Sequence, residues 1–225
     1  METGRLAKLL LAAPSLSALQ AEDAEELSEH CRLRNLRKGQ ILFSAGDPAD
    51  SLLVVVSGRL RVLVTSPEGG ELVLSILGPG DSLGEVGCLG GGTRSAGVEA
   101  LVDSRVLQLP AAELMALVER RPQLSRDLLA QMATQLRRLT GVTSDLVFLD
   151  VPRRVAKLLV AEFDRAGGTD LRLQETQSQL GARVGGTRQS VNAALRALEH
   201  RDWIEVSGRH IALRNPAALR RFSES

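Results

Sequence analysis

Short apolar runs separated by glycine-rich turns fill the chain between residues 37 and 109. Turn signals such as Ala45-Gly46-Asp47-Pro48 and Gly78-Pro79-Gly80-Asp81 fall between the runs. Strands this short, at a spacing of roughly 8–12 residues, are typical of a β-sandwich or a β-barrel. We therefore expect strands over residues 41–43, 52–56, 60–64, 72–77 and 106–109.

The pattern changes to a helical period after residue 110. A short helix is expected over residues 111–118. Apolar residues then recur every three or four positions towards residue 146, which predicts one helix of roughly six turns. Such a helix, with one apolar stripe beside a β-domain, commonly pairs with a copy of itself. We therefore expect a homodimer, the alternative being that the stripe packs on the β-domain. The stripe consists of Leu124, Leu128, Met132, Leu136 and Leu139.

Asp150-Val151-Pro152 interrupts the helical pattern, because proline is tolerated in the first turn of a helix and not in its interior. An amphipathic helix is expected over residues 153–163, and residues 171–173 can form a small strand. The break separates the long helix from a C-terminal segment with a pattern of its own.

Two helix starts and a tight turn follow one another in that segment. Thr176 and Gln179 form the spacing of a capping box, in which each side chain bonds to the other's backbone amide. Gly185-Gly186 supplies a tight turn, where glycine permits the backbone to cross closely. Thr187 can cap a second helix. Two helices with this connection are typical of a helix-turn-helix.

The second helix has one apolar and one polar face. Arg188, Gln189 and Asn192 lie opposite its apolar side, near the N-terminus. A recognition helix offers such residues to the major groove, where Arg pairs with guanine, and Gln or Asn with adenine. Residues 203–206 and 210–213 then alternate around a Gly-containing turn, which predicts a wing with Arg209 as a phosphate contact. The alternative, an ordinary helical hairpin with a surface arginine, does not account for this order of caps and turns.

Composition and charge narrow the function classes. Aromatic residues make up only 2% of the chain, which argues against stacking on single-stranded nucleic acid. Residues 1–149 carry a net charge of −3 and residues 150–225 a net charge of +4, so the positive excess lies in the C-terminal segment. The two cysteines and three isolated histidines predict neither a metal site nor a catalytic triad. The apolar run over residues 9–13 is too short for a membrane span, and we expect a cytoplasmic protein that is not an enzyme.

From about residue 10 the chain resembles the cyclic AMP receptor protein (catabolite activator) and FNR superfamily of bacterial transcription regulators. Turns, a phosphate-binding cassette, a hinge and a recognition helix carry the resemblance. The matching motifs are Lys38-Gly39-Gln40, Ala45-Gly46-Asp47, Val56-Ser57-Gly58, Gly80-Asp81-Ser82-Leu83-Gly84-Glu85, Arg94-Ser95-Ala96, Phe148-Leu149-Asp150-Val151 and Thr187-Arg188-Gln189-Ser190-Val191-Asn192.

The resemblance implies an α+β chain of three parts. Residues 1–120 would form a cyclic-nucleotide-binding sensor built as a jelly-roll-like β-roll. Residues 121–149 would form the long dimerisation helix and hinge, and residues 150–225 a winged helix-turn-helix that binds DNA. The implied function is a homodimeric transcription regulator of a two-fold operator, controlled allosterically by a cyclic nucleotide. RNA polymerase is a further candidate partner.

The cassette has the chemistry that a cyclic nucleotide needs. Arg94 can fork onto the phosphate, and Ser95 can donate a further hydrogen bond. Glu85 can accept from the ribose 2′-hydroxyl. The alternative is an internal Arg–Glu pair that braces a loop. The resemblance implies a ligand site of Gly84, Glu85, Val86, Arg94, Ser95, Leu139 and Thr140, and a DNA-binding set of Thr176, Thr187, Arg188, Gln189, Ser190, Asn192 and Arg209.

Several positions depart from the family pattern. A gap-free count from Phe148 puts Leu139 and Thr140 where cyclic-AMP members have Thr-Ser, so one polar contact to the base is lost; a gap would put Thr143-Ser144 there instead. In the recognition helix, Gln189 replaces a Glu and Ala193 a basic residue, so a different operator is expected.

The effector expected from the resemblance is cyclic AMP, with cyclic GMP or another ligand as alternatives and no prosthetic group. The cysteine cluster of the oxygen-sensing branch and an obvious haem ligand are both missing from the sequence. Two rival interpretations stay open. One is a family member that is independent of nucleotides or answers to another effector, and the other is a cyclic-nucleotide-binding regulatory subunit of an enzyme.

Overall fold

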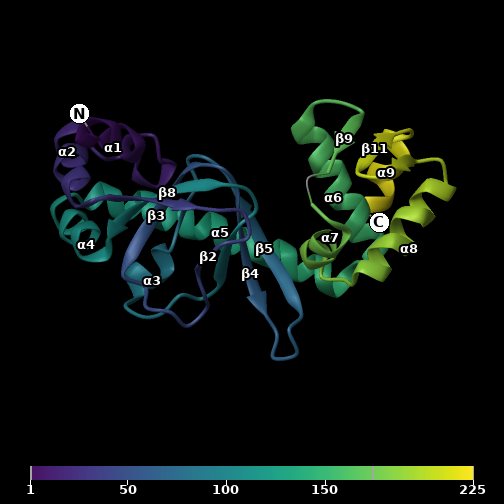
Figure 1. Cartoon of the computed structure of the whole chain (residues 1–225), viewed down its shortest axis with the longest axis horizontal. Helices are drawn as coiled ribbons and strands as arrows, with labels where there is room; N and C mark the ends of the chain where they lie inside the picture. The colour runs from purple at the N-terminus through teal and green to yellow at the C-terminus, as the bar shows by residue number, and fades with distance from the viewer. Residues whose placement is uncertain (1, 174, 225) are drawn as a thin grey trace. The chain divides into compact units, whose positions relative to one another are not determined.

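Eight strands from the first half of the chain form two four-stranded sheets (Figure 1). Five of these strands are the ones that the turn-punctuated apolar runs predict. The structure is a computed structural model that describes residues 2–173 and 175–224. One sheet has the strand order β1-β8-β3-β6, and the other has the order β2-β7-β4-β5. The strands are β1 (Arg32–Leu36), β2 (Ile41–Phe43), β3 (Ser51–Ser57), β4 (Leu60–Thr65), β5 (Glu71–Leu77), β6 (Ser82–Leu83), β7 (Gly97–Ala100) and β8 (Ser104–Pro110).

Strand β3 is apolar along its length because both of its faces are covered. Successive side chains of a strand point to opposite faces. Leu52 and Val54 join a core with the N-terminal helices, whereas Leu53 and Val55 join a second core with the other sheet. All four side chains are at most 2% exposed, which is why this run lacks the alternation of a half-exposed strand.

Helices that precede and follow the β-strands in the sequence close the first of these cores, the one that contains Leu52 and Val54. Leu10, Leu16, Leu27, Leu114 and Leu124 are fully or almost fully buried there, together with apolar residues of β3 and β8. The helices that contribute are α1 (Glu2–Leu11), the 3-10 helix η1 (Pro14–Leu16), α2 (Ala21–His30), α4 (Ala111–Arg120) and the start of α5 (Pro122–Phe148).

Helix α5 confirms the long helix that the apolar stripe predicts, and it continues as α-helix through Gly141. Only its first two stripe residues, Leu124 and Leu128, are buried in the chain. Leu136 is 66% exposed and Leu139 is 40% exposed. The alternative that the whole stripe packs on the β-domain therefore does not hold.

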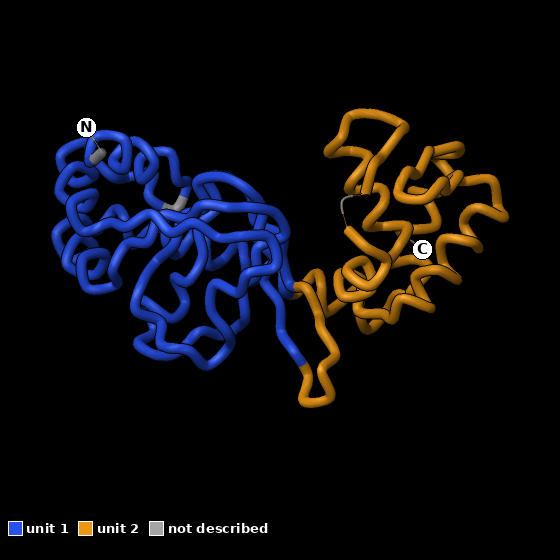
Figure 2. Tube along the Cα trace, viewed as in Figure 1, with its two compact units in different colours: residues 1–65, 74–139 blue, residues 66–73, 140–225 orange. Residues whose placement is uncertain are grey.

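The chain divides into two compact units (Figure 2), of which residues 1–65 and 74–139 form the first and residues 66–73 and 140–225 the second. In the second unit, Asp150 caps α6, accepting a hydrogen bond from the Arg153 amide at 3.0 Å. Buried apolar residues of α6, α7, α8 and α9 form one core with the small sheet. These elements are α6 (Val151–Ala166), α7 (Gln177–Val184), α8 (Arg188–His200), α9 (Pro216–Glu224), β9 (Asp170–Arg172), β10 (Ile204–Ser207) and β11 (His210–Leu213).

The predicted wing is a three-stranded sheet of order β10-β11-β9. The small strand expected at 171–173 forms one residue earlier, as β9, and pairs with β11. Ser207 pairs with His210, so the hairpin turns over the two residues Gly208 and Arg209. Gly208 has a φ of +62°, a conformation that glycine adopts without strain.

Candidate ligand cavity and DNA-binding surface

A cavity of about 350 Å³ lies in the first unit, between the β-strands, the short helix α3 (Glu85–Gly90) and α5. Its wall is mainly apolar, with a few polar groups from the cassette and from α5. The residues that line it are Phe43, Val62, Leu74, Ser75, Leu77, Ser82, Leu83, Gly84, Glu85, Val86, Gly87, Arg94, Ser95, Ala96, Val98, Gln135, Arg138 and Leu139.

Arg94 is a buried cation, 5% exposed, at the edge of this cavity. Its Nη2 donates to Ser51 Oγ at 3.1 Å and lies 3.7 Å from Asp50 Oδ1, while its Nη1 donates to the Gly84 carbonyl at 3.4 Å. The guanidinium also lies 4.4 Å from the centre of the Phe43 ring, which adds a cation–π contact. Its Nε is buried and has no hydrogen-bond partner among the described residues. The side chain is thus held in place with a donor still unused.

Glu85 is the acid of the same cavity and is only 1% exposed. Its Oε1 accepts a hydrogen bond from Gln135 Nε2. Its Oε2 is buried and, within the described part of the chain, lacks a hydrogen-bond partner. Burial raises the pKa of Glu85, although the hydrogen bond from Gln135 and the charge of Arg94 act in the opposite direction. A buried acceptor of this kind is stabilised by a ligand hydroxyl.

Arg94 and Glu85 direct their hydrogen bonds and ion pairs to different partners and not to each other. The alternative of an internal Arg–Glu brace is therefore not what the cassette forms. Gly84 directly precedes Glu85 and has a φ of +93°, and a Cβ added to it would lie 2.2 Å from Arg94 Nη1. Only glycine fits this position without displacing the arginine.

The structure brings most of the predicted ligand-site residues to the cavity wall. Val86, Ser95 and Leu139 line the cavity together with Gly84, Glu85 and Arg94. The side chains of Val86, Ser95 and Leu139 are exposed. Thr140 is exposed and does not line the cavity. Leu139 at the wall favours the gap-free count from Phe148, because Thr143 lies a full helical turn further along α5.

Sequence reasoning missed two α5 residues of the wall, Gln135 and Arg138. They precede Leu139 by four positions and one position, so Gln135 shares a helix face with it. Once Leu139 is assigned to the ligand site, the spacing of four positions predicts that Gln135 faces the same site. Without that assignment, a glutamine on a long and largely exposed helix is not distinguished from the other polar residues of the helix.

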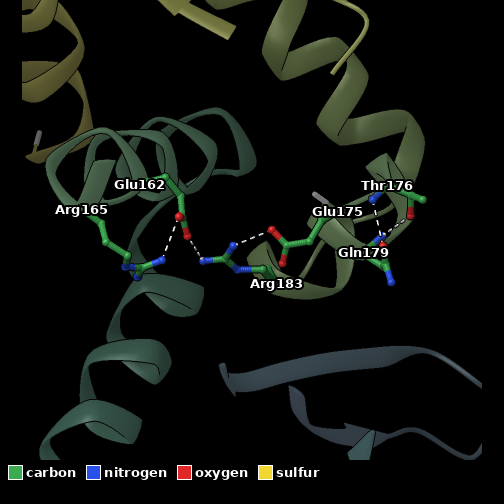
Figure 3. Close-up of polar contacts among 6 residues, drawn as sticks. All are labelled: Glu162, Arg165, Glu175, Thr176, Gln179 and Arg183. Carbon is green, nitrogen blue, oxygen red and sulfur yellow. Dashed lines mark hydrogen bonds and ion pairs between the residues drawn. The ribbon is translucent and has the colours of Figure 1, made fainter. Parts of the chain in front are cut away.

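The helix-turn-helix has both predicted N-caps. The Thr176 hydroxyl accepts from the Gln179 amide at 3.3 Å, and the Thr176 amide donates to Gln179 Oε1 at 2.8 Å (Figure 3). The Thr187 hydroxyl accepts from the Ser190 amide at 3.1 Å, and Ser190 Oγ accepts from the Thr187 amide at 2.9 Å. The hydroxyls of Thr176, Thr187 and Ser190 therefore hold the helix starts in place.

Helix α8 presents the predicted readers on its open face. Arg188 and Gln189 are exposed and Asn192 is half-buried, whereas Val191 and Leu195 on the other face are buried. Arg196 is exposed one turn beyond Asn192, a position that the sequence reasoning did not select. A groove beside α8 is lined by Thr176, Arg188 and Arg209 together with apolar residues, so α7, α8 and the wing share one surface. These three side chains come from segments more than ten residues apart.

Neither a metal site nor a membrane helix is found in the described ranges. Across residues 2–173 and 175–224, no group of three or more His, Cys, Asp or Glu side chains could hold a metal ion. Within the same ranges, no helix is both long and apolar enough to cross a membrane.

Similar proteins share both halves of this arrangement. The CRP-like cAMP-activated global transcriptional regulator of Mycobacterium tuberculosis is 33% identical over 189 residues, covering 82% of this chain and 84% of that protein. The cAMP-activated global transcriptional regulator CRP of Escherichia coli O6:H1 is 31% identical over 189 residues, covering 82% and 90%. The structure of FixK2 from Bradyrhizobium japonicum matches with a TM-score of 0.76 at 25% identity, over 87% of this chain and 98% of that one.

A β-roll with a polar cassette, a long helix and a winged helix-turn-helix define a ligand-responsive DNA-binding regulator. Residues 33–121 match the cyclic nucleotide-binding domain family, and residues 153–222 match the Crp-like helix-turn-helix domain family. The chain belongs to the CRP/FNR superfamily of transcription regulators. It is a DNA-binding regulator and not an enzyme.

Proposed function

We propose that the chain controls transcription as a homodimer whose affinity for a two-fold operator is set by a cyclic nucleotide, cyclic AMP first among the candidates. The observation that carries the proposal is a pair of buried polar atoms at one cavity, Glu85 Oε2 and Arg94 Nε, neither of which has a hydrogen-bond partner among the residues that the structure describes. A cyclic nucleotide supplies both partners, a ribose hydroxyl for the carboxylate and an anionic phosphodiester for the guanidinium. The relatives from Mycobacterium tuberculosis and Escherichia coli are described as cAMP-activated, which supports this choice of ligand.

In this proposal, the ligand site consists of the cavity residues Gly84, Glu85, Val86, Arg94, Ser95 and Leu139. Thr140 lies outside the cavity wall and is assigned to the site by the resemblance alone. Residues 1–120 act as the sensor, residues 121–149 as the dimerisation helix and hinge, and residues 150–225 as the DNA-binding domain. Leu136 and the other exposed apolar side chains of α5 support pairing between two copies, because water-exposed leucines on one face of a long helix favour association. The protein would act in the cytoplasm, where its DNA lies, with RNA polymerase as a further partner.

The DNA-binding set of this proposal is Thr176, Thr187, Arg188, Gln189, Ser190, Asn192 and Arg209. Arg188, Gln189 and Asn192 read base edges, whereas the capped helix starts and Arg209 contact phosphates. The exposed face of α8 and the shared groove support this division of roles.

Titration calorimetry with cyclic AMP and cyclic GMP, followed by selection of bound sites from random duplexes, tests the two halves of the proposal. We expect saturable binding of a cyclic nucleotide and tighter operator binding in its presence. Operator affinity that neither nucleotide changes would instead support the rival, a family member that is independent of nucleotides. Half-sites about 34 Å apart are expected for a two-fold reader.

Leu139→Thr is expected to increase the affinity for cyclic AMP by roughly 2- to 12-fold, because one net hydrogen bond contributes about 0.5–1.5 kcal/mol. Leu139 lines the cavity, and the hydroxyl would restore a polar contact to the adenine base. Calorimetric titration of wild type and variant measures the change. Leu11→Thr is the matched control, since Leu11 is 41% exposed at the end of helix α1 and is outside the cavity wall. An unchanged dissociation constant for Leu139→Thr would mean that the base does not reach this position.

Arg188→Ala is expected to weaken binding to the selected operator by roughly 5- to 150-fold, because a bidentate Arg–guanine pair contributes about 1–3 kcal/mol of discrimination. Fluorescence anisotropy against the operator and a scrambled duplex measures the loss, which should be confined to the operator. Arg220→Ala removes the same charge from α9, where Arg220 pairs with Asp164, and should leave both affinities near wild type. Equal losses on both duplexes would mark Arg188 as a phosphate contact only.

A further inference from the structure

Helix α5 contributes three residues of one helical face to the cavity wall. Gln135, Arg138 and Leu139 all line the cavity, and the second and third follow the first by three and four positions. Residues at this spacing lie on the same side of an α-helix. Gln135 donates to Glu85 Oε1, so this side of α5 faces the interior of the cavity. Arg138 is therefore placed to reach a ligand that fills it.

The described residues of the cavity wall include two cations, Arg94 and Arg138. Arg94 is buried in the cassette, where the proposed ligand has its phosphodiester, whereas Arg138 is exposed on α5. A cyclic nucleotide carries a single negative charge, and the fork of Arg94 matches it. The guanidinium of Arg138 thus faces a different part of the ligand.

That part is the base. With the phosphate at Arg94 and the ribose hydroxyl at Glu85, the base extends away from the cassette, towards the wall that β4, β5 and α5 contribute. On this wall the amide of Gln135 is engaged with Glu85, which leaves Ser75 and Arg138 as the polar side chains beside the base. The apolar side chains of this wall are Val62, Leu74, Leu77 and Leu139.

The two purines differ at the edge that a guanidinium recognises. Guanine presents two acceptors there, N7 and O6, and a planar guanidinium bonds both at once. Adenine presents N7 beside an amino group, so a second bond is lost and two donors face each other. The hydroxyl of Ser75 both donates and accepts, and it therefore suits either base. Arg138 is the side chain of this wall that tells the two bases apart.

We infer that Arg138 is a specificity-determining residue of the cavity, whose guanidinium binds the N7 and O6 edge of guanine and favours cyclic GMP relative to cyclic AMP. The inference rests on the proposed function, because it needs a cyclic nucleotide held by Arg94 and Glu85. It concerns the balance between the two candidate ligands, and the cassette still supplies the affinity that they share.

Calorimetric titration of the full-length protein with four nucleotides tests the inference. Cyclic AMP and cyclic GMP give the preference, cyclic IMP has the N7 and O6 of guanine without its 2-amino group, and 7-deaza cyclic GMP lacks N7. Arg138→Leu removes the guanidinium, and Arg138→Lys keeps the charge without the planar fork. Arg137→Leu is the matched control, because Arg137 is exposed on the same helix, donates to Thr134 Oγ1 at 3.0 Å and is outside the cavity wall.

In Arg138→Leu, we expect the affinity for cyclic GMP relative to cyclic AMP to fall by at least about 5-fold, the lower end of the discrimination by a bidentate Arg–guanine pair. Cyclic IMP should show the same fall, and 7-deaza cyclic GMP a smaller one. Arg138→Lys should give an intermediate ratio. Arg137→Leu should keep the wild-type ratio, because both nucleotides carry the same charge. Binding of cyclic AMP by Arg138→Leu verifies that its β-roll is folded.

Several results would overturn the inference. A wild-type ratio in Arg138→Leu, or an equal change in Arg137→Leu, would show that the guanidinium of Arg138 does not read the base. A fall for cyclic GMP that cyclic IMP does not share would place the contact at the 2-amino group. Wild type that binds cyclic AMP and no cyclic GMP would overturn the inference and leave the proposed function in place. Wild type that binds neither nucleotide would overturn the proposed function itself.

Discussion

Arg94→Ala is expected to lower the affinity for cyclic AMP by at least ~100-fold. Hydrogen bonds to a charged group contribute about 1.5–3 kcal/mol each, and a guanidinium can donate two to a phosphodiester. At about 1.4 kcal/mol for each factor of ten, the loss of two such bonds exceeds 100-fold. Ser51, Gly84 and Phe43 already hold the guanidinium in place, so little ordering remains to oppose binding. Calorimetric titration of the variant measures the loss.

Two further variants separate the loss of a positive charge from the loss of the planar guanidinium of Arg94. Arg37→Ala removes the same charge from an exposed position in the same unit and should bind cyclic AMP like wild type. Arg94→Lys keeps the charge without the planar fork, so its affinity should lie between those of wild type and Arg94→Ala. Circular dichroism verifies that the β-roll is intact in each case. Equal affinity of Arg94→Ala and wild type would remove the cassette from the ligand site.

The parts of the fold that sequence predicted well are those in which local chemistry decides the structure. Thr176 and Thr187 each start a helix with a side-chain cap, and the Gly185 turn between the helices has a φ of +62°. The apolar runs of β3, β4 and β5 likewise have strand propensity along their length. Local pattern and final structure agree at these positions, so few alternatives remain.

The missed elements are those that only tertiary pairing creates. Strand β1 (Arg32–Leu36) alternates without a continuous apolar run, β6 has only two residues, and β7 (Gly97–Ala100) begins with a glycine. Each becomes a strand because a neighbour satisfies its backbone groups; Arg32, for example, pairs with Gln108 on β8. Sequence periodicity contains no information about a partner so far along the chain.

Distance along the chain also decides which residues of the ligand site could be predicted from the sequence. Glu85 and Arg94 lie nine positions apart inside one recognisable motif, so they could be selected together. Gln135 is fifty positions from its partner Glu85, and Gln131 is forty-nine from Ser82. Only the fold of α5 along the cassette brings these groups into contact. Contacts of this kind are where a structure adds most to a motif.

Arg183→Met is expected to destabilise the second unit by about 3–5 kcal/mol, the usual effect of removing one partner of a buried ion pair. Arg183 on α7 donates at 2.8 Å to both Glu162 on α6 and Glu175 before α7, and Arg165 donates to the other oxygen of Glu162 (Figure 3). Arg183, Glu162 and Glu175 are each at most 15% exposed, so both carboxylates would stay buried without this cation. The helix-turn-helix would lose the brace between α6 and α7.

Trp203 provides the measurement, because it is the only tryptophan of the chain and packs against Phe222 in the core of this unit. Urea unfolding followed by Trp203 fluorescence gives the free energy of unfolding of the second unit. Arg165→Met is the matched control: Arg165 is 60% exposed, and its loss should change that free energy by less than about 1 kcal/mol. Equal effects of the two substitutions would contradict the role of Arg183 as the central cation.

The destabilisation caused by Arg183→Met should depend on pH, because Arg183 pairs with carboxylates that can be protonated. In wild type, burial alone would raise the pKa of Glu162, but Arg183 and Arg165 outweigh it, so the pKa lies below its ordinary value of 4.5. The ion pairs therefore stabilise the fold above about pH 4.5, and that stability is lost as the pH falls through the lowered pKa. Without Arg183 only Arg165 opposes the effect of burial, so the pKa of Glu162 is higher in the variant than in wild type, and protonation of Glu162 in mild acid relieves part of the destabilisation. The difference between wild type and Arg183→Met should thus be largest near pH 7 and shrink towards pH 4.5; a difference that stays constant over this range would mean that packing, and not charge, is what Arg183 contributes.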